Sequence, residues 1–145
     1  MAVVKFYKDI EDEQLSFAVV ISKMNGKWVL CKHKERTTLE FPGGHREVGE
    51  SILETAKREL QEETGAKEFT INLVGFYSVK GTIRNGGEHK NELFGALFTA
   101  EIKSLKQELN SEIERVFLMA DLPTNWTYSE IMPILIKKMQ ENGGY

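Results

Sequence analysis

The sequence has 145 residues, of which 41% are hydrophobic and 28% are charged, and its formal net charge is −3. This balance is typical of a globular protein, and the length favours one domain over residues 1–145. It contains no long basic run, which argues against an electrostatic grip on extended nucleic acid. The single cysteine, Cys31, fits a reducing compartment, and no stretch approaches membrane-spanning length, so we expect a cytoplasmic protein.

The first third of the chain predicts β-strands. Residues 2–7 predict a short edge strand, and the continuous apolar, β-branched run of residues 15–22 predicts a strand covered on both faces. Asn25-Gly26 is typical of a hairpin turn, so residues 27–33 are expected to return as the partner strand.

A helix is predicted after the glycine pair Gly43-Gly44. Ser51, with Glu54 three residues later, forms the pattern of a capping box, and Gly65 is placed to end the helix in a left-handed conformation. At about 100° per residue, one side of this helix is apolar and is expected to face a core. That side comprises Ile52, Leu53, Ala56 and Leu60.

Three carboxylates are expected to be neighbours on this helix. Glu59, Glu62 and Glu63 follow the spacing i, i+3, i+4, and Glu63 projects within the apolar stripe with Glu59 at its edge. Carboxylates in a partly buried position repel one another and lose hydration, and a divalent cation removes both penalties. Ligands that are all oxygen suit Mg²⁺ or Mn²⁺.

The rest of the chain predicts further strands and a closing helix. Residues 68–80 predict one long strand or two short ones, and a hairpin turn at Asn85-Gly86-Gly87 leads to a strand at residues 92–102. Residues 112–119 predict another strand, and residues 128–141 predict an amphipathic helix that tolerates Pro133 in its first turns. Strands that flank one helix, followed by a second helix, imply an α/β fold in which a sheet has a helix on each face.

The stretch from Gly43 to Ala66 resembles the Nudix box, G-x5-E-x7-R-E-U-x-E-E-x-G-U, where U is a bulky or aliphatic residue. Ala66 is a small occupant of the last U position, and all seven fixed positions match: Gly44, Glu50, Arg58, Glu59, Glu62, Glu63 and Gly65. The resemblance implies an α/β/α sandwich around a mixed central sheet, in which the box forms a loop, a helix and a loop.

Members of this family hydrolyse a nucleoside diphosphate linked to another moiety. The resemblance implies that Glu59, Glu62 and Glu63 ligate the metal, with the Gly43 carbonyl completing the coordination and Glu63 the least replaceable. Glu59 would act as a ligand or as a base, and Arg58 would hold the glutamates in place. Glu50 has two open interpretations, as a support for these ligands or as a favourable acid near the helix N-terminus.

Some family members take their general base from a glutamate in a later loop. Glu112 is our choice here because it begins a predicted strand, with Glu108 and Glu114 as alternatives. Arg84 is a candidate phosphate contact, although it lies in a charged hairpin tip that would also suit solvent.

Asn125-Trp126 precedes the last helix and is a candidate site for a base, since an indole offers a stacking face and an amide offers a donor and an acceptor. A core or surface role for the Trp126 side chain is the alternative. The three histidines lack a metal-ligand spacing, so no metal is assigned to them.

We therefore expect a Mg²⁺-dependent hydrolase, with Mn²⁺ as a substitute, that resembles the MutT-type enzymes. It would convert a nucleoside triphosphate, with an oxidised purine such as 8-oxo-dGTP among the candidates, to a monophosphate and pyrophosphate. Alternatives are hydrolysis of an RNA 5′-triphosphate or a dinucleoside polyphosphate, and a non-catalytic nucleotide-binding regulator. The expected partner is a small nucleotide, and the oligomeric state is left open.

Overall fold

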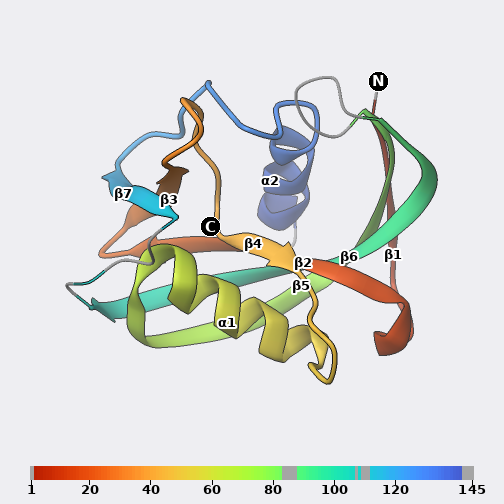
Figure 1. Ribbon diagram of the computed structural model, residues 1–145, viewed down its shortest axis with the longest axis horizontal. Coiled ribbons are helices and arrows are strands. Elements are labelled where there is room, and N and C mark those ends of the chain that lie inside the picture. The colour runs from red at the N-terminus through yellow and green to blue at the C-terminus, as the bar shows by residue number, and fades with distance from the viewer. Residues whose placement is uncertain (1, 83–87, 107, 109–111, 142–145) are drawn as a thin grey trace.

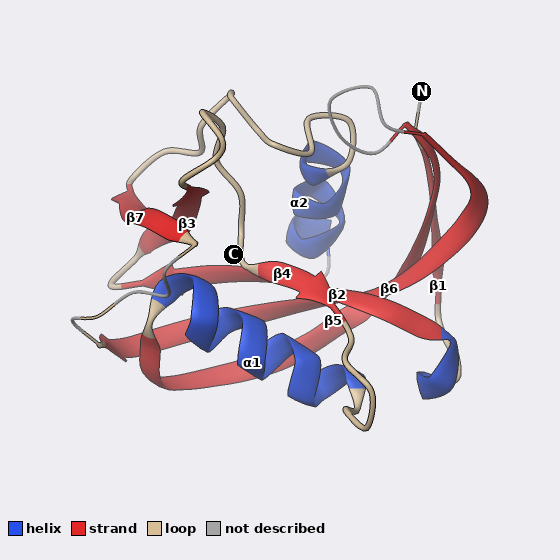
Figure 2. Cartoon of the chain, in the orientation of Figure 1, coloured by secondary structure: helices blue, strands red, loops and turns tan. Residues whose placement is uncertain are grey.

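A computed structural model describes residues 2–82, 88–106, 108 and 112–141 of the chain (Figures 1 and 2). It contains a seven-stranded sheet, two α-helices and the short 3-10 helix η1 (Asp12–Gln14). The strands are β1 (Val3–Tyr7), β2 (Leu15–Met24), β3 (Lys27–His33), β4 (Gly43–His45), β5 (Ala66–Thr82), β6 (Glu88–Leu105) and β7 (Ile113–Met119). The helices are α1 (Ile52–Thr64) and α2 (Met132–Glu141), and neither offers a membrane-spanning apolar length within the described residues.

The sheet is mixed and has the order β1-β5-β6-β2-β3-β7. β2 and β6 run parallel, and the other pairs are antiparallel. The second edge of β2 is divided between two partners, since residues 17–19 pair with β4 and residues 22–24 pair with β3. This division lets the glycine strand β4 lie in the sheet directly beside α1 (Figure 1).

The two helices cover opposite faces of the sheet (Figure 2). Beneath α1, a mostly aliphatic core with side chains from β2, β3, β5 and β6 buries Ile52, Ala56 and Leu60. Beneath α2, a second core joins Leu135, Ile136 and Met139 to several aromatic rings. The predicted α/β sandwich with a mixed sheet is therefore confirmed.

Helix α1 has the predicted ends. The Ser51 hydroxyl accepts from the Glu54 N–H at 3.2 Å and the Glu54 carboxylate accepts from the Ser51 N–H at 2.9 Å, and Gly65 ends the helix with φ 77°. Leu53, predicted to face the core, is instead 41% exposed. Its side chain lies in the first turn and points back toward the helix N-terminus, where the covered surface ends.

The other described elements lie at or near their predicted positions, except that β5 and β6 are longer than predicted and α2 is shorter. The hairpin at Asn25-Gly26 has both residues at positive φ, as a tight I′-type turn requires. The predicted strands 68–80 and 92–102 form one long antiparallel pair, β5 and β6, whose register shifts at several points. Helix α2 begins at Met132 rather than at residue 128, because the Tyr128 carbonyl accepts the N–H groups of Ile131 and Met132 in a preceding turn. The predicted turn at Asn85-Gly86-Gly87 lies outside the described residues.

Candidate active site

The glycine strand β4 lies against the acidic side of α1. The Gly43 N–H donates to Glu63 Oε1 at 2.7 Å, and this bond fixes the carboxylate of a side chain that is only 7% exposed. A Cβ atom at Gly44 would lie 2.6 Å from the carboxyl carbon of Glu59. Glycine at this position therefore lets the Glu59 carboxylate lie directly on the strand backbone.

Arg58 joins the carboxylates of α1 to the preceding loop. Its Nε and Nη2 atoms bind the two oxygens of Glu50 at 2.6 and 3.1 Å, in the two-pronged geometry that strengthens guanidinium–carboxylate pairs. Its Nη1 atom donates to Glu59 at 2.8 Å and to Glu62 at 3.3 Å, and Nη2 donates to the His45 carbonyl at 3.0 Å. The Arg58 guanidinium lowers the pKa of Glu50 to about 2.

The carboxylates nearest to β4 are strained electrostatically. Burial raises the pKa of Glu59 to about 7, and repulsion from Glu63 adds to the effect while Arg58 opposes it. Burial also raises the pKa of Glu63. Raised pKa values mean that the ionised carboxylates on this helix face are disfavoured, because too little positive charge lies near them. A divalent cation held by their oxygen atoms would supply that charge. The residues therefore fit the Mg²⁺ or Mn²⁺ ion that the resemblance implies.

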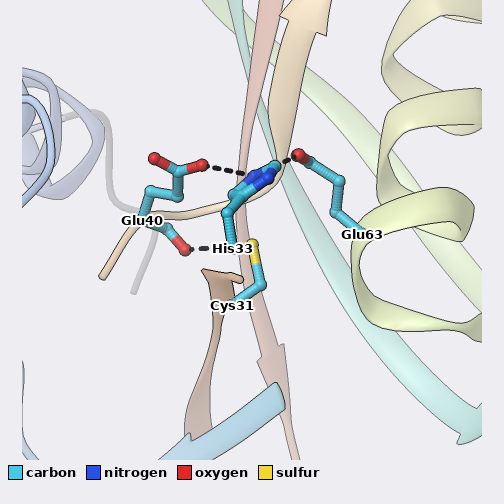
Figure 3. Close-up of side chains that lie close together, drawn as sticks. All are labelled: Cys31, His33, Glu40 and Glu63. Atoms are coloured by element: carbon cyan, nitrogen blue, oxygen red, sulfur yellow. Dashed lines mark hydrogen bonds and ion pairs between the residues drawn. The ribbon is translucent and has the colours of Figure 1, made fainter. Parts of the chain in front are cut away.

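Glu63 has a second contact that the sequence did not predict (Figure 3). His33 Nε2 lies 2.9 Å from Glu63 Oε2 and 2.6 Å from Glu40 Oε1. Arg36 Nη1 binds both oxygens of Glu40, at 2.7 and 2.8 Å. A chain of charged groups thus runs from Arg36 through Glu40 and His33 to Glu63. The Glu63 carboxylate raises the pKa of His33 against the opposing effect of burial.

The contacts of His33 are not visible in the spacing of the three histidines, which follows no metal-ligand pattern. The sequence does indicate that Cys31 and His33 lie close together, because residues two apart in a strand project from the same face. Glu40 comes to this face through an isolated bridge, in which the N–H and carbonyl groups of Cys31 and Glu40 bind each other at 2.9 and 3.1 Å. Glu40 itself lies outside the predicted strands, so this pairing was not predicted.

An apolar cavity of about 150 Å³ opens on the other side of the glycine strand. Its lining joins β2, β4, β5 and β6 to α2 and includes Phe17, Glu40, Tyr77, Leu93 and Tyr128. The Phe17 ring meets the rings of Tyr77 and His45 edge to face, with centroids 5.5 and 6.3 Å apart. Because Gly43, Gly44 and His45 also line it, the cavity begins where the carboxylates of α1 end.

The three candidate general bases outside the box have different surroundings. The Glu112 carbonyl accepts from the Lys34 N–H at 3.0 Å, which puts this exposed residue beside the end of β3 and near His33. Glu108 is exposed, and the Glu114 carboxylate pairs with Lys32 at 2.8 Å.

Asn125 and Trp126 lie beyond the cavity. The Asn125 side chain donates to the Thr37 carbonyl at 3.4 Å, and the Trp126 indole is 8% exposed and packs on Phe41 in the core. Neither is among the described residues that line the cavity. Arg84 lies outside the described residues.

Comparisons with known proteins agree with this geometry. Residues 12–135 match the NUDIX domain model. YtkD of Bacillus subtilis (strain 168), provisionally named an 8-oxo-dGTP diphosphatase, is 31% identical over 134 residues, which cover 86% of this chain and 80% of YtkD.

Solved structures with this fold include two hydrolases. The crystal structure of the B. subtilis pyrophosphohydrolase BsRppH has a TM-score of 0.78 and 28% identity, and the match covers 98% of this chain and 91% of BsRppH. A C. elegans Ap4A hydrolase has the same fold, with a TM-score of 0.64 and 17% identity, over 88% of this chain and 99% of that one. The chain therefore belongs to the Nudix family of hydrolases.

Proposed function

We propose that the protein hydrolyses nucleoside triphosphates to nucleoside monophosphates and pyrophosphate, with oxidised purine nucleotides such as 8-oxo-dGTP among its substrates. One observation carries this proposal: the carboxylate face of α1 and the apolar cavity meet at the glycine strand β4. A nucleotide has the same two parts, an anionic phosphate chain and a flat apolar base. The similarity to YtkD supports the choice of substrate.

The phosphate end of the substrate belongs on the α1 side. Glu59, Glu62, Glu63 and the Gly43 carbonyl would hold Mg²⁺, which when bound neutralises phosphate oxygens and lowers the pKa of a coordinated water. The chain itself contributes pre-organisation. Arg58 contacts both Glu59 and Glu62, and the Gly43 N–H fixes Glu63, so little reorganisation is needed when substrate binds.

The base end belongs in the cavity. Ligand pockets for drug-sized molecules measure about 300–1,000 Å³, so a cavity of about 150 Å³ suits one base and leaves the sugar and phosphates outside. Aromatic rings of Phe17, Tyr77 and Tyr128 line it and can contact the faces or edges of a purine. Glu40 is the charged group of the described lining that can accept a hydrogen bond from a base.

A general base must remove a proton from the attacking water. We assign this role to Glu112, an exposed residue whose backbone carbonyl accepts from the N–H of Lys34, the residue after His33. Glu59 is the alternative, since its pKa of about 7 suits proton transfer near neutral pH. Glu112→Gln and Glu59→Gln, compared by the pH dependence of turnover, distinguish the two.

The test is a substrate panel with the purified protein. Ordinary and oxidised nucleoside triphosphates, ADP-ribose, dinucleoside polyphosphates and triphosphorylated RNA are incubated with Mg²⁺ and then with EDTA. We expect pyrophosphate from the triphosphates, abolished by EDTA, with the highest kcat/KM for an oxidised purine. Preferred cleavage of RNA ends or of dinucleoside polyphosphates would overturn the substrate assignment, and product release undiminished by EDTA would overturn the metal dependence.

A further inference from the structure

Glu63 belongs to a cluster of four side chains that offer sulfur, nitrogen and oxygen donor atoms (Figure 3). Cys31 and His33 come from β3, Glu40 from the segment before β4, and Glu63 from α1. One donor atom of each lies within 4.8 Å of all the others. Figure 3 shows the His33 ring between the two carboxylates, with the Cys31 sulfur beneath. Glu63 is the member of the cluster that the proposed hydrolysis assigns to the Mg²⁺ site, and Glu40 also lines the base cavity.

The backbone holds this cluster together before any ligand arrives. The two hydrogen bonds between Cys31 and Glu40 fix their main chains, and Cys31 Sγ lies 3.5 Å from the Glu40 carbonyl oxygen. Glu63 comes from the other side, with Oε1 bound by the Gly43 N–H and Oε2 turned toward His33. Cys31 is fully buried, and Glu40 is 4% exposed.

One polar atom of the cluster, His33 Nε2, is poorly satisfied. His33 Nε2 is buried and makes no well-aligned hydrogen bond, although two carboxylate oxygens lie 2.6 and 2.9 Å from it. Buried polar atoms without a partner are uncommon and indicate a missing partner or ligand. Glu40 and Glu63 place two carboxylates around this atom, and Arg36 compensates Glu40 only.

The Cys31 sulfur lies in the electrostatic field of the two carboxylates. The pKa of the Cys31 thiol is raised, first by burial and then by the negative charges of Glu63 and Glu40. Arg36 opposes the shift, and Glu59 adds a smaller contribution in the same direction as the other carboxylates. A cation inside the cluster would therefore be attracted by every anionic group around it.

We propose that Cys31, His33, Glu40 and Glu63 form a second cation site, which binds a borderline divalent ion of the Zn²⁺ class. One sulfur, one imidazole nitrogen and two carboxylate oxygens are the donors and the number that Zn²⁺ takes, whereas Mg²⁺ requires oxygen. With bonds of about 2.0 Å to N or O and about 2.3 Å to S, tetrahedral donors are separated by roughly 3.3–3.5 Å. The separations in the cluster extend from 2.6 to at most 4.8 Å, so side-chain adjustments suffice.

Binding replaces protons with the metal ion. The thiol of Cys31 loses its proton to solvent, as does any imidazolium of His33, and no electron transfer is involved. Glu40 also lines the apolar cavity, which gives the ion a route from solvent. Because Glu63 cannot serve both ions fully, the second site would inhibit hydrolysis by competing with Mg²⁺, a consequence that rests on the proposed function.

Cobalt(II) tests the binding directly, because a tetrahedral Co²⁺ thiolate site absorbs in the visible and adds a sulfur charge-transfer band in the near ultraviolet. Cys31 is the single cysteine of the chain, so such a band has one source. With excess Mg²⁺ present, we expect one equivalent of Co²⁺ per chain to produce both features and Zn²⁺ to bleach them. An octahedral spectrum without the charge-transfer band would overturn the proposal.

Variants separate the cluster from the Mg²⁺ site. Cys31→Ser should lose the charge-transfer band, and His33→Gln should weaken Co²⁺ binding at least about 100-fold. His45→Gln and Glu59→Gln, which alter a histidine and a carboxylate outside the cluster, should keep the band. If either cluster variant does not fold by circular dichroism, the wild-type titration still decides. The readout needs no substrate, so the two proposals can fail separately. An inactive protein with the band would contradict the proposed hydrolysis, and an active protein without the band would contradict the second cation site.

Discussion

On the α1 face of the sheet, charged side chains hold one another in place, whereas on the α2 face aromatic and aliphatic side chains leave a cavity. Arg58 organises the first face through Glu50, Glu59 and Glu62, so a change at Arg58 affects all three carboxylates. The second face depends on packing and tolerates a space of about 150 Å³. Changes on the α1 face should therefore affect turnover and charge, and changes on the α2 face should affect recognition.

The largest effect should follow from loss of one charge at Glu63. Glu63→Gln keeps the size of the side chain but weakens binding of the divalent ion, and we expect kcat to fall about 1,000-fold. Steady-state kinetics in Mg²⁺ and a circular dichroism spectrum measure this. Glu141→Gln, the same change at an exposed position at the end of α2, is the control. Near-normal turnover of the Glu63 variant would remove Glu63 from the metal site.

A smaller loss is expected when Arg58 becomes lysine. Lysine keeps the positive charge but cannot bind both oxygens of Glu50 while contacting Glu59. We expect kcat to fall about 100-fold with KM little changed, since the groups are mispositioned and not removed. Arg115→Lys, at an exposed position of β7, should behave as wild type. An equal loss in both variants would mean that the Arg58 contacts have no special role.

The raised pKa of Glu59 has a consequence for stability. The pKa of Glu59 is about 7 in the folded protein, against an ordinary value of 4.5, so the folded state binds the proton more tightly than the unfolded state. Without metal, the folded protein therefore loses stability as the pH rises from 4.5 to 7. Glu59→Gln should remove this loss and stabilise the metal-free protein at pH 7.5 by about 2 kcal/mol, after allowance for partial exposure.

Urea unfolding in EDTA at pH 5 and pH 7.5 measures the effect. Glu62→Gln, whose side chain is 43% exposed on the same helix, is the control and should change little. Equal stability of the wild type and the Glu59 variant at pH 7.5 would contradict the assignment of a buried, repelled carboxylate.

The smallest effect should come from the α2 face. Leu93→Phe adds bulk to the cavity wall, and we expect KM for purine triphosphates to rise about tenfold with kcat unchanged. Leu73→Phe, at a position 51% exposed on the neighbouring strand β5, is the control. A fall in kcat without a change in KM would show that the cavity does not bind the base.

The α1 region was predictable because its determinants are local. Ser51, Glu54 and Gly65 define the ends of the helix from their own neighbours in sequence, and angular spacing places Glu63 among apolar residues. The same count failed for Leu53, since spacing gives a direction but not the extent of the covering surface.

The contacts of Glu63 with His33, and of His33 with Glu40, could not be predicted from local spacing. His33 and Glu40 are seven positions apart, and they meet because an isolated bridge aligns Glu40 with Cys31. The position of Trp126 shows the same limit. Its approach to Phe41 depends on a parallel bridge between Leu39 and Trp126, so a residue with two plausible roles from sequence is buried in the core by a distant pairing.

The parallel pairing of β2 with β6 also constrains when the protein can fold during its synthesis. β2 emerges from the ribosome early, but its partner residues 94–101 follow only after α1 and the whole of β5. Until then Ile52, Ala56 and Leu60 have an incomplete surface on which to pack. Long-range pairings of this kind are closed late and slowly. The acidic helix should therefore dock only when most of the chain has been translated, and its charged side would keep the waiting nascent chain soluble.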